Sequence, residues 1–187
     1  YNNFSATNLV ASDKMVDSPT NNFATLNPLD TDFSGTLSEG NLQVATGGGM
    51  SSTFHFPASG KWYWEYTITG GTANQAFPGI ATQPYSSSSR LFYYSSSGDI
   101  YENTVGGASY GASYTTGDVI GVAANVDDGE VTFYKNNSSQ GVKSYTYFDS
   151  MTPHFRDGGD TVTMVVNFGQ DSSFAGNETA QGNQDGN

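Results

Sequence analysis

The sequence contains no cysteine, only six lysines and arginines, and two histidines in 187 residues. The absence of cysteine excludes disulfide bonds, thiolate zinc sites and thiol nucleophiles. Eighteen Asp and Glu residues give a formal net charge of −12, which repels nucleic-acid phosphates and anionic membrane surfaces. No apolar run has the length of a membrane span. We therefore expect neither nucleic-acid binding nor membrane insertion.

Aromatic residues and glycine are abundant instead. Twelve Tyr, twelve Phe and 23 Gly favour short strands joined by tight turns over long helices. The clearest segment is 117–141, in which an apolar run at 119–126 and an alternating run at 131–135 flank a turn sequence, Asp127-Asp128-Gly129-Glu130. This pattern predicts a central β-hairpin.

Alternating polarity predicts further core strands at 61–69 and 162–168. Shorter strands are expected within 33–44, 50–56, 77–81, 90–94 and 99–102, whereas the Gly-, Ala- and Ser-rich segment 106–114 and the cluster 136–139 are expected to be loops and turns. The expected core contains Trp62, Trp64, Ile120, Val122, Phe133, Val166 and Phe168. The sequence thus predicts an all-β fold, an antiparallel sandwich of two sheets.

Three separated motifs resemble those of SPRY domains, in the same order. They are Gly60-Lys61-Trp62-Tyr63-Trp64-Glu65, the hairpin segment 117–141, and Met151-Thr152-Pro153-His154-Phe155 followed by Val166-Asn167-Phe168-Gly169-Gln170. The resemblance covers about residues 50–175. It implies a concanavalin-like jelly roll that meets its partners through loops at one end of the sandwich.

We expect three segments along the chain. Residues 1–30 form an irregular lead-in that packs on the sandwich, with Phe23, Leu26 and Leu29 as anchors; residues 31–175 form the sandwich; residues 176–187 form a polar, Gly-rich tail or linker. Within the lead-in, residues 15–29 resemble the segment that precedes SPRY domains in virion structural proteins of marine tailed phages. This favours a virion component, located at the virion surface and extracellular, whose acidic surface is screened in salt water.

Catalytic signatures are missing from the sequence. There is no G-x-S-x-G motif, and His55 and His154 are isolated from each other. A glycosidase would need two carboxylates about 5–10 Å apart, but Glu65 is the single acid of its strand and the acids at 127–130 lie in a turn. We expect no enzymatic activity.

A partial calcium-loop pattern begins at Asp30. Asp30, Asp32 and Ser34 occupy ligand positions and Gly35 the sixth position, but Asn41 stands where a bidentate Glu belongs. An ordinary turn is the favoured interpretation, with calcium as the alternative. No other cofactor is expected.

The candidate binding site lies in Tyr-, Ser- and Gly-rich loops at 70–77, 85–94 and 101–114. This composition pairs rigid rings with adaptable hydrogen-bonding groups, as antibody paratopes do. The predicted ligand-binding residues are Tyr85, Arg90, Tyr93, Tyr110 and Tyr114, with the tyrosine rings exposed. Because Arg90 is the only cation of these loops, we expect a neutral glycan or a polar protein surface as ligand.

Three functions remain open. The first is a virion binding module, as in a tail fibre or adhesin, that recognises a host surface glycan or protein. The second is a capsid decoration or assembly protein that contacts other virion subunits, with homo-oligomerisation as a possible mode. The third is an intracellular SPRY adaptor for protein interactions.

Overall fold

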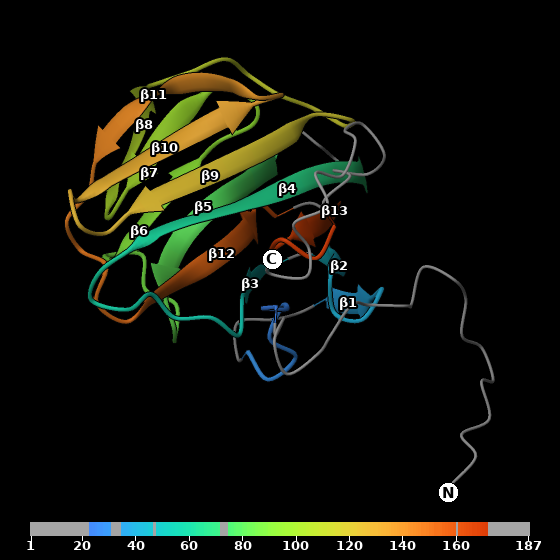
Figure 1. The fold of residues 1–187 in the computed structure, drawn as a ribbon. Coiled ribbons are helices and arrows are strands. Elements are labelled where there is room, and N and C mark those ends of the chain that lie inside the picture. Colours follow the sequence, from blue (N-terminus) through green and yellow to red (C-terminus); the bar gives the residue numbers. More distant parts are fainter. Residues whose placement is uncertain (1–22, 31–34, 47, 72–74, 160, 172–187) are drawn as a thin grey trace, which may run out of the picture.

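The structure is a computed structural model that describes residues 23–30, 35–46, 48–71, 75–159 and 161–171. All thirteen elements named in these ranges are β-strands, and they form two sheets that are stacked face to face (Figure 1). Every strand pair is antiparallel. The all-β, two-sheet antiparallel sandwich is confirmed. Among the described residues, none belongs to a helix with the length and apolarity needed to cross a membrane.

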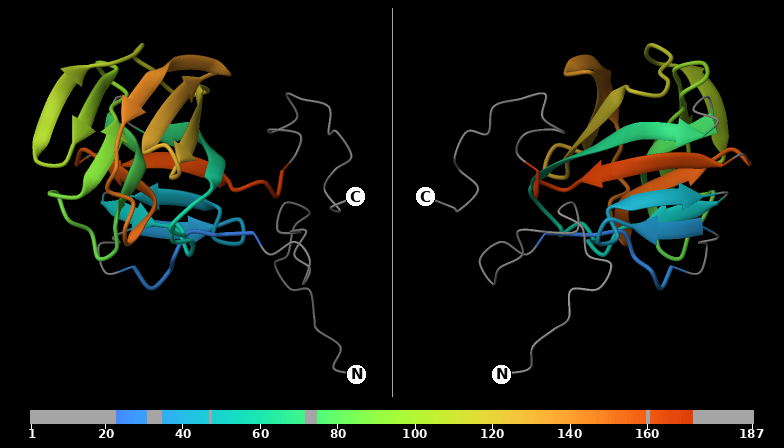
Figure 2. Two further views of the ribbon diagram at one scale, coloured as in Figure 1. Left: turned by 60° about the vertical axis from the view of Figure 1, so that its left-hand side comes forward. Right: turned by 90° about the vertical axis from the view of Figure 1, so that its right-hand side faces the viewer.

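One sheet has seven strands. Their spatial order is β1 (Gly35–Ser38), β2 (Gln43–Thr46), β13 (Val162–Asn167), β4 (Lys61–Gly71), β9 (Val119–Asn125), β10 (Glu130–Lys135) and β11 (Ser138–Ser144). Strands far apart in sequence are neighbours here, since β13 pairs with β2 on one side and β4 on the other. Figure 2 shows β13 in red between the blue N-terminal strands and β4.

The other sheet has six strands. Their order is β3 (Gly49–Ser51), β12 (Met151–Asp157), β5 (Ala76–Thr82), β6 (Arg90–Tyr93), β7 (Asp99–Glu102) and β8 (Val105–Ser109). From β5 to β8 the chain forms a meander in which consecutive strands pair. This leaves β12, β5, β6 and β7 with a neighbour on both sides.

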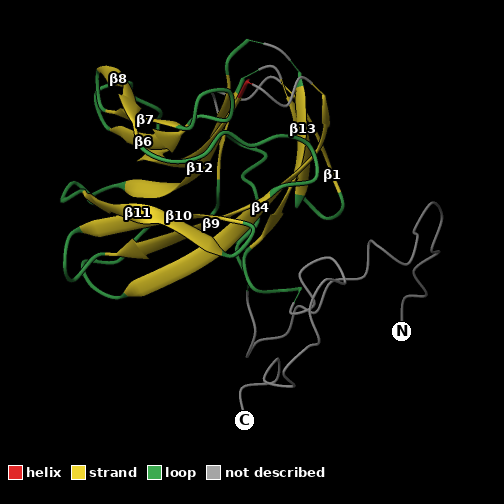
Figure 3. Ribbon diagram, turned by 90° about the horizontal axis from the view of Figure 1, so that it is seen from above, coloured by secondary structure: helices red, strands yellow, loops and turns green. Residues whose placement is uncertain are grey.

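The hydrophobic core lies between the two sheets, whose layers separate clearly when seen from above (Figure 3). The seven-stranded sheet contributes alternate residues of β4, β9, β10 and β13 to the core. Residues of β5, β6 and β12 in the six-stranded sheet pack against them. Five of the seven expected core residues are buried, namely Trp64, Ile120, Val122, Phe133 and Val166. Trp62 and Phe168 are only partly buried and pack against the edge of the core.

The predicted central hairpin is confirmed as β9 and β10, which pair from Asn125–Glu130 to Ile120–Lys135. The turn expected at 136–139 is confirmed at Asn136 and Asn137, but Ser138 and Ser139 already belong to strand β11, and strand β8 lies where a loop was expected. Strand β11 follows β10 through Asn136 and Asn137, both at positive φ, which Asn tolerates in tight hairpin turns. Strand β8 consists of exposed small residues and Val105, so it shows no polarity alternation.

The described part of the lead-in packs against the sandwich through residues 25–30, which hydrogen-bond to Asn41, Ser51 and Thr53. Leu26 is buried and forms a bridge with Ser52, as expected of an anchor. Phe23 is half-buried. Leu29 is 84 % exposed, so its expected role as an anchor is wrong. Residues 1–22 lie outside the described residues.

Candidate functional site: a pocket on the outer face of the six-stranded sheet

Strand alternation places a set of large side chains on the face of the six-stranded sheet that points away from the core. In β6, Leu91 and Tyr93 enter the core, so Arg90 and Phe92 face outward. In β12, Met151 and Phe155 enter the core, so His154 and Arg156 face outward. Strands β5 and β7 add Phe77 and Tyr101.

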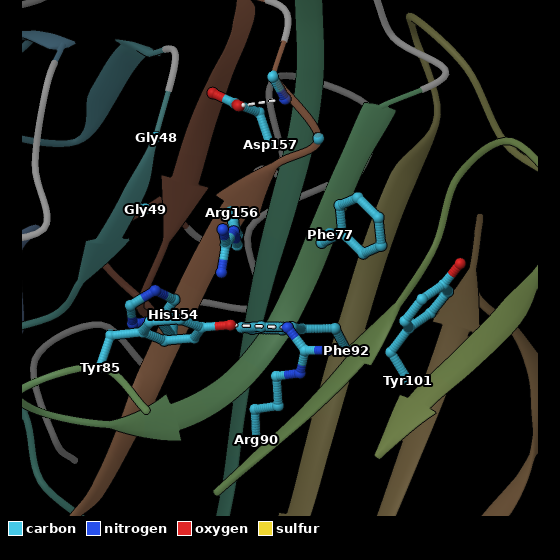
Figure 4. Close-up of a pocket in the computed structure, with 12 residues that line it drawn as sticks. Gly48, Gly49, Phe77, Tyr85, Arg90, Phe92, Tyr101, His154, Arg156 and Asp157 are labelled. Atoms are coloured by element: carbon cyan, nitrogen blue, oxygen red, sulfur yellow. Dashed lines mark hydrogen bonds between the residues drawn. The ribbon is translucent and has the colours of Figure 1, made fainter. Parts of the chain in front are cut away.

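These side chains border a pocket of about 430 Å³, called here the outer-face pocket (Figure 4). A volume of this order is typical of sites for small ligands. The pocket is lined by Gly48, Gly49, Phe77, Tyr85, Arg90, Phe92, Tyr101, His154, Arg156, Asp157, Gly158 and Gly159.

The strand register aligns three lining residues and Gly79 in one row across the sheet. His154 pairs with Gly79, Gly79 with Phe92, and Phe92 with Tyr101. Gly79 leaves room in the middle of the row, since a Cβ there would lie 2.0 Å from the Leu91 carbonyl oxygen and 2.9 Å from the Phe92 ring. Any side chain at this position would displace the floor of the pocket.

Glycine also makes room at the ends of the pocket. A Cβ at Gly49 would lie 2.9 Å from Nε2 of His154, and a Cβ at Gly106 would lie 2.5 Å from the Tyr101 ring. The rings of His154 and Tyr101 therefore lie directly over the backbone of the neighbouring strands β3 and β8. A side chain at Gly49 or Gly106 would therefore push the neighbouring ring out of its place.

The aromatic rings of this face form a continuous array. Phe77 stacks on Tyr94 with centroids 4.3 Å apart and meets Tyr101 edge-on at 5.2 Å. Tyr85 stacks on His154 at 5.4 Å and on Phe92 at 6.4 Å. The array offers flat apolar faces with hydroxyl groups at their rims.

Both arginines of the chain line this pocket, and both contact Tyr85. Arg90 donates a hydrogen bond from Nη1 to the Tyr85 hydroxyl at 2.7 Å and one from Nε to the Asn103 carbonyl at 2.9 Å. The Arg156 guanidinium lies 4.8 Å from the centre of the Tyr85 ring. Figure 4 shows Arg90 at the hydroxyl of Tyr85 and Arg156 beside its ring.

Neither guanidinium has a carboxylate within ion-pair distance among the described residues. The three ion pairs found there all use lysines, with Lys61 to Asp128, Lys135 to Asp118 and Lys143 to Glu102. In a chain with a net charge of −12, the outer-face pocket therefore gathers two positive charges that no ion pair neutralises among the described residues. Asp157 is the acidic side chain of the lining, and its Oδ1 accepts a hydrogen bond from the Gly159 amide at 2.9 Å.

His154 lies at the floor of the pocket with 1 % of its surface exposed. Neither ring nitrogen has a hydrogen-bond partner among the described residues. Burial lowers the pKa of His154 to about 4, although the Asp30 carboxylate raises it and Arg156 lowers it further. The imidazole is therefore neutral near pH 7, and the positive charge of the pocket comes from Arg90 and Arg156.

The structure separates the five predicted ligand-binding residues. Tyr85 and Arg90 lie together in the outer-face pocket. Tyr93 is 0 % and Tyr114 3 % exposed, so the expectation that their rings are exposed is wrong. Both belong to the core, where the Tyr114 hydroxyl donates to the carbonyls of Tyr93 and Ala76.

Tyr110 is half-buried and links the two sheets instead of facing a pocket. Its hydroxyl donates to the Gly141 carbonyl of β11 and accepts a hydrogen bond from the Phe133 amide of β10 at 3.2 Å. Its ring packs edge-on against those of Tyr93 and Phe133. The ring therefore fixes the segment that follows β8 to the seven-stranded sheet.

The three predicted loops do not gather at one end of the sandwich. The connection before β6 lies beside the β7–β8 turn, because Arg90 and Asn103 exchange hydrogen bonds. The start of β5 lies beside the β6–β7 turn at the opposite end, where Ser95 donates to the Ala76 carbonyl and the Ala76 amide donates to Ser95. Tyr114 joins this second end by donating its amide to the Ser95 carbonyl.

Sequence reasoning missed Phe77, Phe92, Tyr101, His154 and Arg156 as site residues. The available signal was the alternation within 151–157, which places His154 and Arg156 on the face opposite Met151 and Phe155. The alternation does not show which strands pair with β12, because strand pairing depends on the topology of the sheet.

Other predicted chemical groups lie outside the pocket. Glu65 is on the seven-stranded sheet, where burial raises its pKa and the Tyr63 hydroxyl donates to it at 2.6 Å. The Asp30 carboxylate accepts hydrogen bonds from the amide and hydroxyl of Ser51. Its expected calcium partners Asp32 and Ser34 lie outside the described residues. Within the described ranges, no three His, Asp or Glu side chains gather in a metal-binding cluster.

Comparison with solved structures gives matches to SPRY domains at low sequence identity. The SPRY domain of human HERC1 is 15 % identical, with a TM-score of 0.68 over 78 % of this chain and 99 % of that chain. A human SPRY domain is 16 % identical, with a TM-score of 0.57 over 73 % and 96 %. Stonustoxin is 18 % identical, with a TM-score of 0.61 over 77 % of this chain but only 27 % of the toxin chain.

At these identities the likeness shows the fold. A search of curated proteins finds no match. The family assignment therefore comes from the sequence pattern, which matches the SPRY domain over residues 61–171, from the start of β4 to the last described residue. With more than half of the chain matched and the sandwich in place, the chain belongs to the SPRY domain family.

Proposed function

We propose that this chain is a non-catalytic recognition module that holds part of its partner in the outer-face pocket. SPRY domains are generally protein-interaction modules, and the fold is generally not enzymatic. The observation that carries the proposal is the gathering of both arginines, without carboxylate partners in the described structure, on an aromatic-lined pocket of an acidic protein.

This arrangement contributes little to stability. A guanidinium beside a ring and without a carboxylate partner adds only a modest cation–π term. A buried imidazole without hydrogen bonds costs free energy. Groups that fold stability does not require, and that converge on a cavity, are typical of binding sites.

The proposed setting is the surface of a virion, with a host surface glycan or protein as partner. Its support is the sequence alone, namely the resemblance of residues 15–29 to the lead-in of SPRY-containing virion proteins, and the acidic, lysine-poor composition. The pocket is compatible with either class of partner, because rings and guanidinium groups contact sugars and protein side chains alike.

The test is a binding screen of the full chain against glycan and peptide arrays, followed by affinity measurements on the ligand found. Tyr101→Ala removes an outer ring of the pocket, and Tyr63→Ala is the matched control on the outer face of the opposite sheet, where Tyr63 is 49 % exposed. We expect Tyr101→Ala to weaken binding about tenfold, or about 1.4 kcal/mol, and Tyr63→Ala to leave it unchanged.

Two results would contradict the proposal. If Tyr101→Ala and Arg156→Ala, both still folded by circular dichroism, bind the ligand as the unchanged chain does, the outer-face pocket is not the binding site. If the screen yields no ligand at all, the decoration or assembly function takes precedence.

A further inference from the structure

The outer-face pocket also indicates what kind of ligand it accepts, an inference that rests on the proposed function. Its two guanidinium groups lack carboxylate partners in the described structure, although the chain carries three times as many acids as bases. Each arginine is held by other contacts: Arg90 by Tyr85 and Asn103, and Arg156 by the face of Tyr85. Guanidinium groups fixed in this way favour a carboxylate, which they bind through paired N–H groups.

The rest of the pocket favours a ring attached to that carboxylate. The Tyr101 ring stands edge-on to Phe77 at 5.2 Å and lies over Gly106, so it is rigidly placed at the rim. Its hydroxyl makes no hydrogen bond to another described residue. A half-exposed ring with a free hydroxyl at its edge offers an apolar face to one side of a pyranose and a hydrogen bond to its hydroxyl groups.

The position of the pocket argues against an extended peptide. Peptides that bind β-proteins commonly add a strand to a free sheet edge, where backbone groups are unpaired. Gly49 of the edge strand β3 borders one end of the pocket, but the other strand residues of the lining belong to β12, β5, β6 and β7, each of which pairs on both sides, so their main-chain groups are used within the sheet. Recognition here is left to side chains.

The charge of the whole molecule argues against a polyanion. With a net charge of −12, the protein as a whole repels a ligand that carries many negative charges. Two guanidinium groups are well matched to a single carboxylate.

We propose that the outer-face pocket binds an acidic sugar, a pyranose that bears one carboxylate. Arg156 and Arg90 bind the carboxylate, and the rings of Tyr101 and Phe77 pack against one face of the pyranose. This replaces the neutral glycan expected from the sequence, since strand pairing brings Arg156 of β12 close to the Tyr85 and Arg90 that the sequence analysis selected.

The experiment is a titration followed by the side-chain Nε–Hε signals of arginine in ¹H–¹⁵N spectra of the full chain. The chain has two arginines, so the spectrum contains two such signals, and Arg90→Lys and Arg156→Lys assign them. The probes are glucuronate and galacturonate, with glucose as the neutral match, acetate as the bare carboxylate and a short Glu-rich peptide as the acidic protein surface. Arg156→Gln removes one charge, and Lys61→Gln removes a charge from a 69 % exposed side chain on the opposite sheet.

We expect both uronates to shift the two arginine signals and to bind at least about tenfold more tightly than glucose or acetate. Arg156→Gln should abolish this preference, whereas Lys61→Gln should keep it. Circular dichroism and thermal melting establish that each variant is folded.

Each other outcome overturns the inference in a different way. Equal binding of glucose shows that the carboxylate is not recognised, and equal binding of acetate reveals a plain anion site. Tighter binding of the Glu-rich peptide makes the ligand a protein surface, and equal losses in Arg156→Gln and Lys61→Gln mean a non-specific charge effect. In all four cases the proposed function is tested separately, by the effect of Tyr101→Ala on binding of the ligand found in the array screen. If no probe shifts either signal, acidic-sugar binding is refuted.

Discussion

The buried imidazole at the floor of the pocket leads to a prediction about acid stability. Burial lowers the pKa of His154 from 6.5 to about 4. Above pH 6.5 the side chain is neutral in both the folded and the unfolded chain, and its effect on the free energy of unfolding is constant. Between pH 6.5 and pH 4 the unfolded chain binds a proton that the folded chain excludes, so stability falls as the pH falls. With these two pKa values, His154 alone costs about 2 kcal/mol between pH 7 and pH 5.

The assay is urea unfolding of the full chain at pH 7 and at pH 5. His154→Leu removes the titrating group and keeps a side chain of similar bulk, so its loss of stability over this interval should be smaller than that of the unchanged chain by about 2 kcal/mol. His55→Leu makes the same substitution at the other histidine, which is exposed, and so controls for the loss of a histidine as such. If His154→Leu and the unchanged chain lose the same free energy, the folded protein binds a proton at His154 near pH 5, and its imidazole is not enclosed as described.

Three further changes test the fold around the pocket. Gly79→Ala should lower the free energy of unfolding by at least about 2 kcal/mol in chemical denaturation, because its Cβ meets the Leu91 carbonyl oxygen, whereas Gly70→Ala, whose Cβ lies 3.8 Å from Thr163, should change it far less. Tyr114→Phe should lower the free energy of unfolding by about 1–2 kcal/mol, since two buried carbonyls lose a hydrogen bond, and it should leave ligand affinity unchanged. A weaker affinity in a folded variant would show that Tyr114 belongs to the binding site. Phe133→Ala should cost about 3–5 kcal/mol because the ring is fully buried between the sheets, and a cost below 1 kcal/mol would contradict its place in the core.

The fold was predictable from the sequence where side-chain polarity alternates. The strand 61–71 shows Trp64, Tyr66 and Ile68 on one face, and the hairpin 119–135 combines two apolar runs with an acidic turn. Strands β8 and β11 were missed because both lie at a sheet edge with mostly exposed residues, and such strands need no apolar face. Backbone pairing with one neighbouring strand holds them in the sheet, together with contacts such as the ion pair between Lys143 and Glu102.

The candidate site was only half predictable. Tyr85 and Arg90 were predicted from the composition of one segment, and the structure places both in the pocket. Tyr93 and Tyr114 have the same Ser- and Gly-rich surroundings, but they point into the core, because a loop-like composition does not fix the side to which a ring points. Arg156 could not be predicted as a site residue, because its proximity to Tyr85 depends on the pairing of β12 with β5.

The row that joins His154, Gly79, Phe92 and Tyr101 follows hydrogen-bonded strands from β12 to β7. The residues of this row are preorganised, because strand pairing holds them in place before a ligand arrives. Insertions and deletions in the connections therefore leave the row where it is, although Tyr85 lies in the β5–β6 connection and would move with it. The same domain is free to acquire a second specificity in its loops, as antibodies do on their own sandwich, while the first is retained on the sheet.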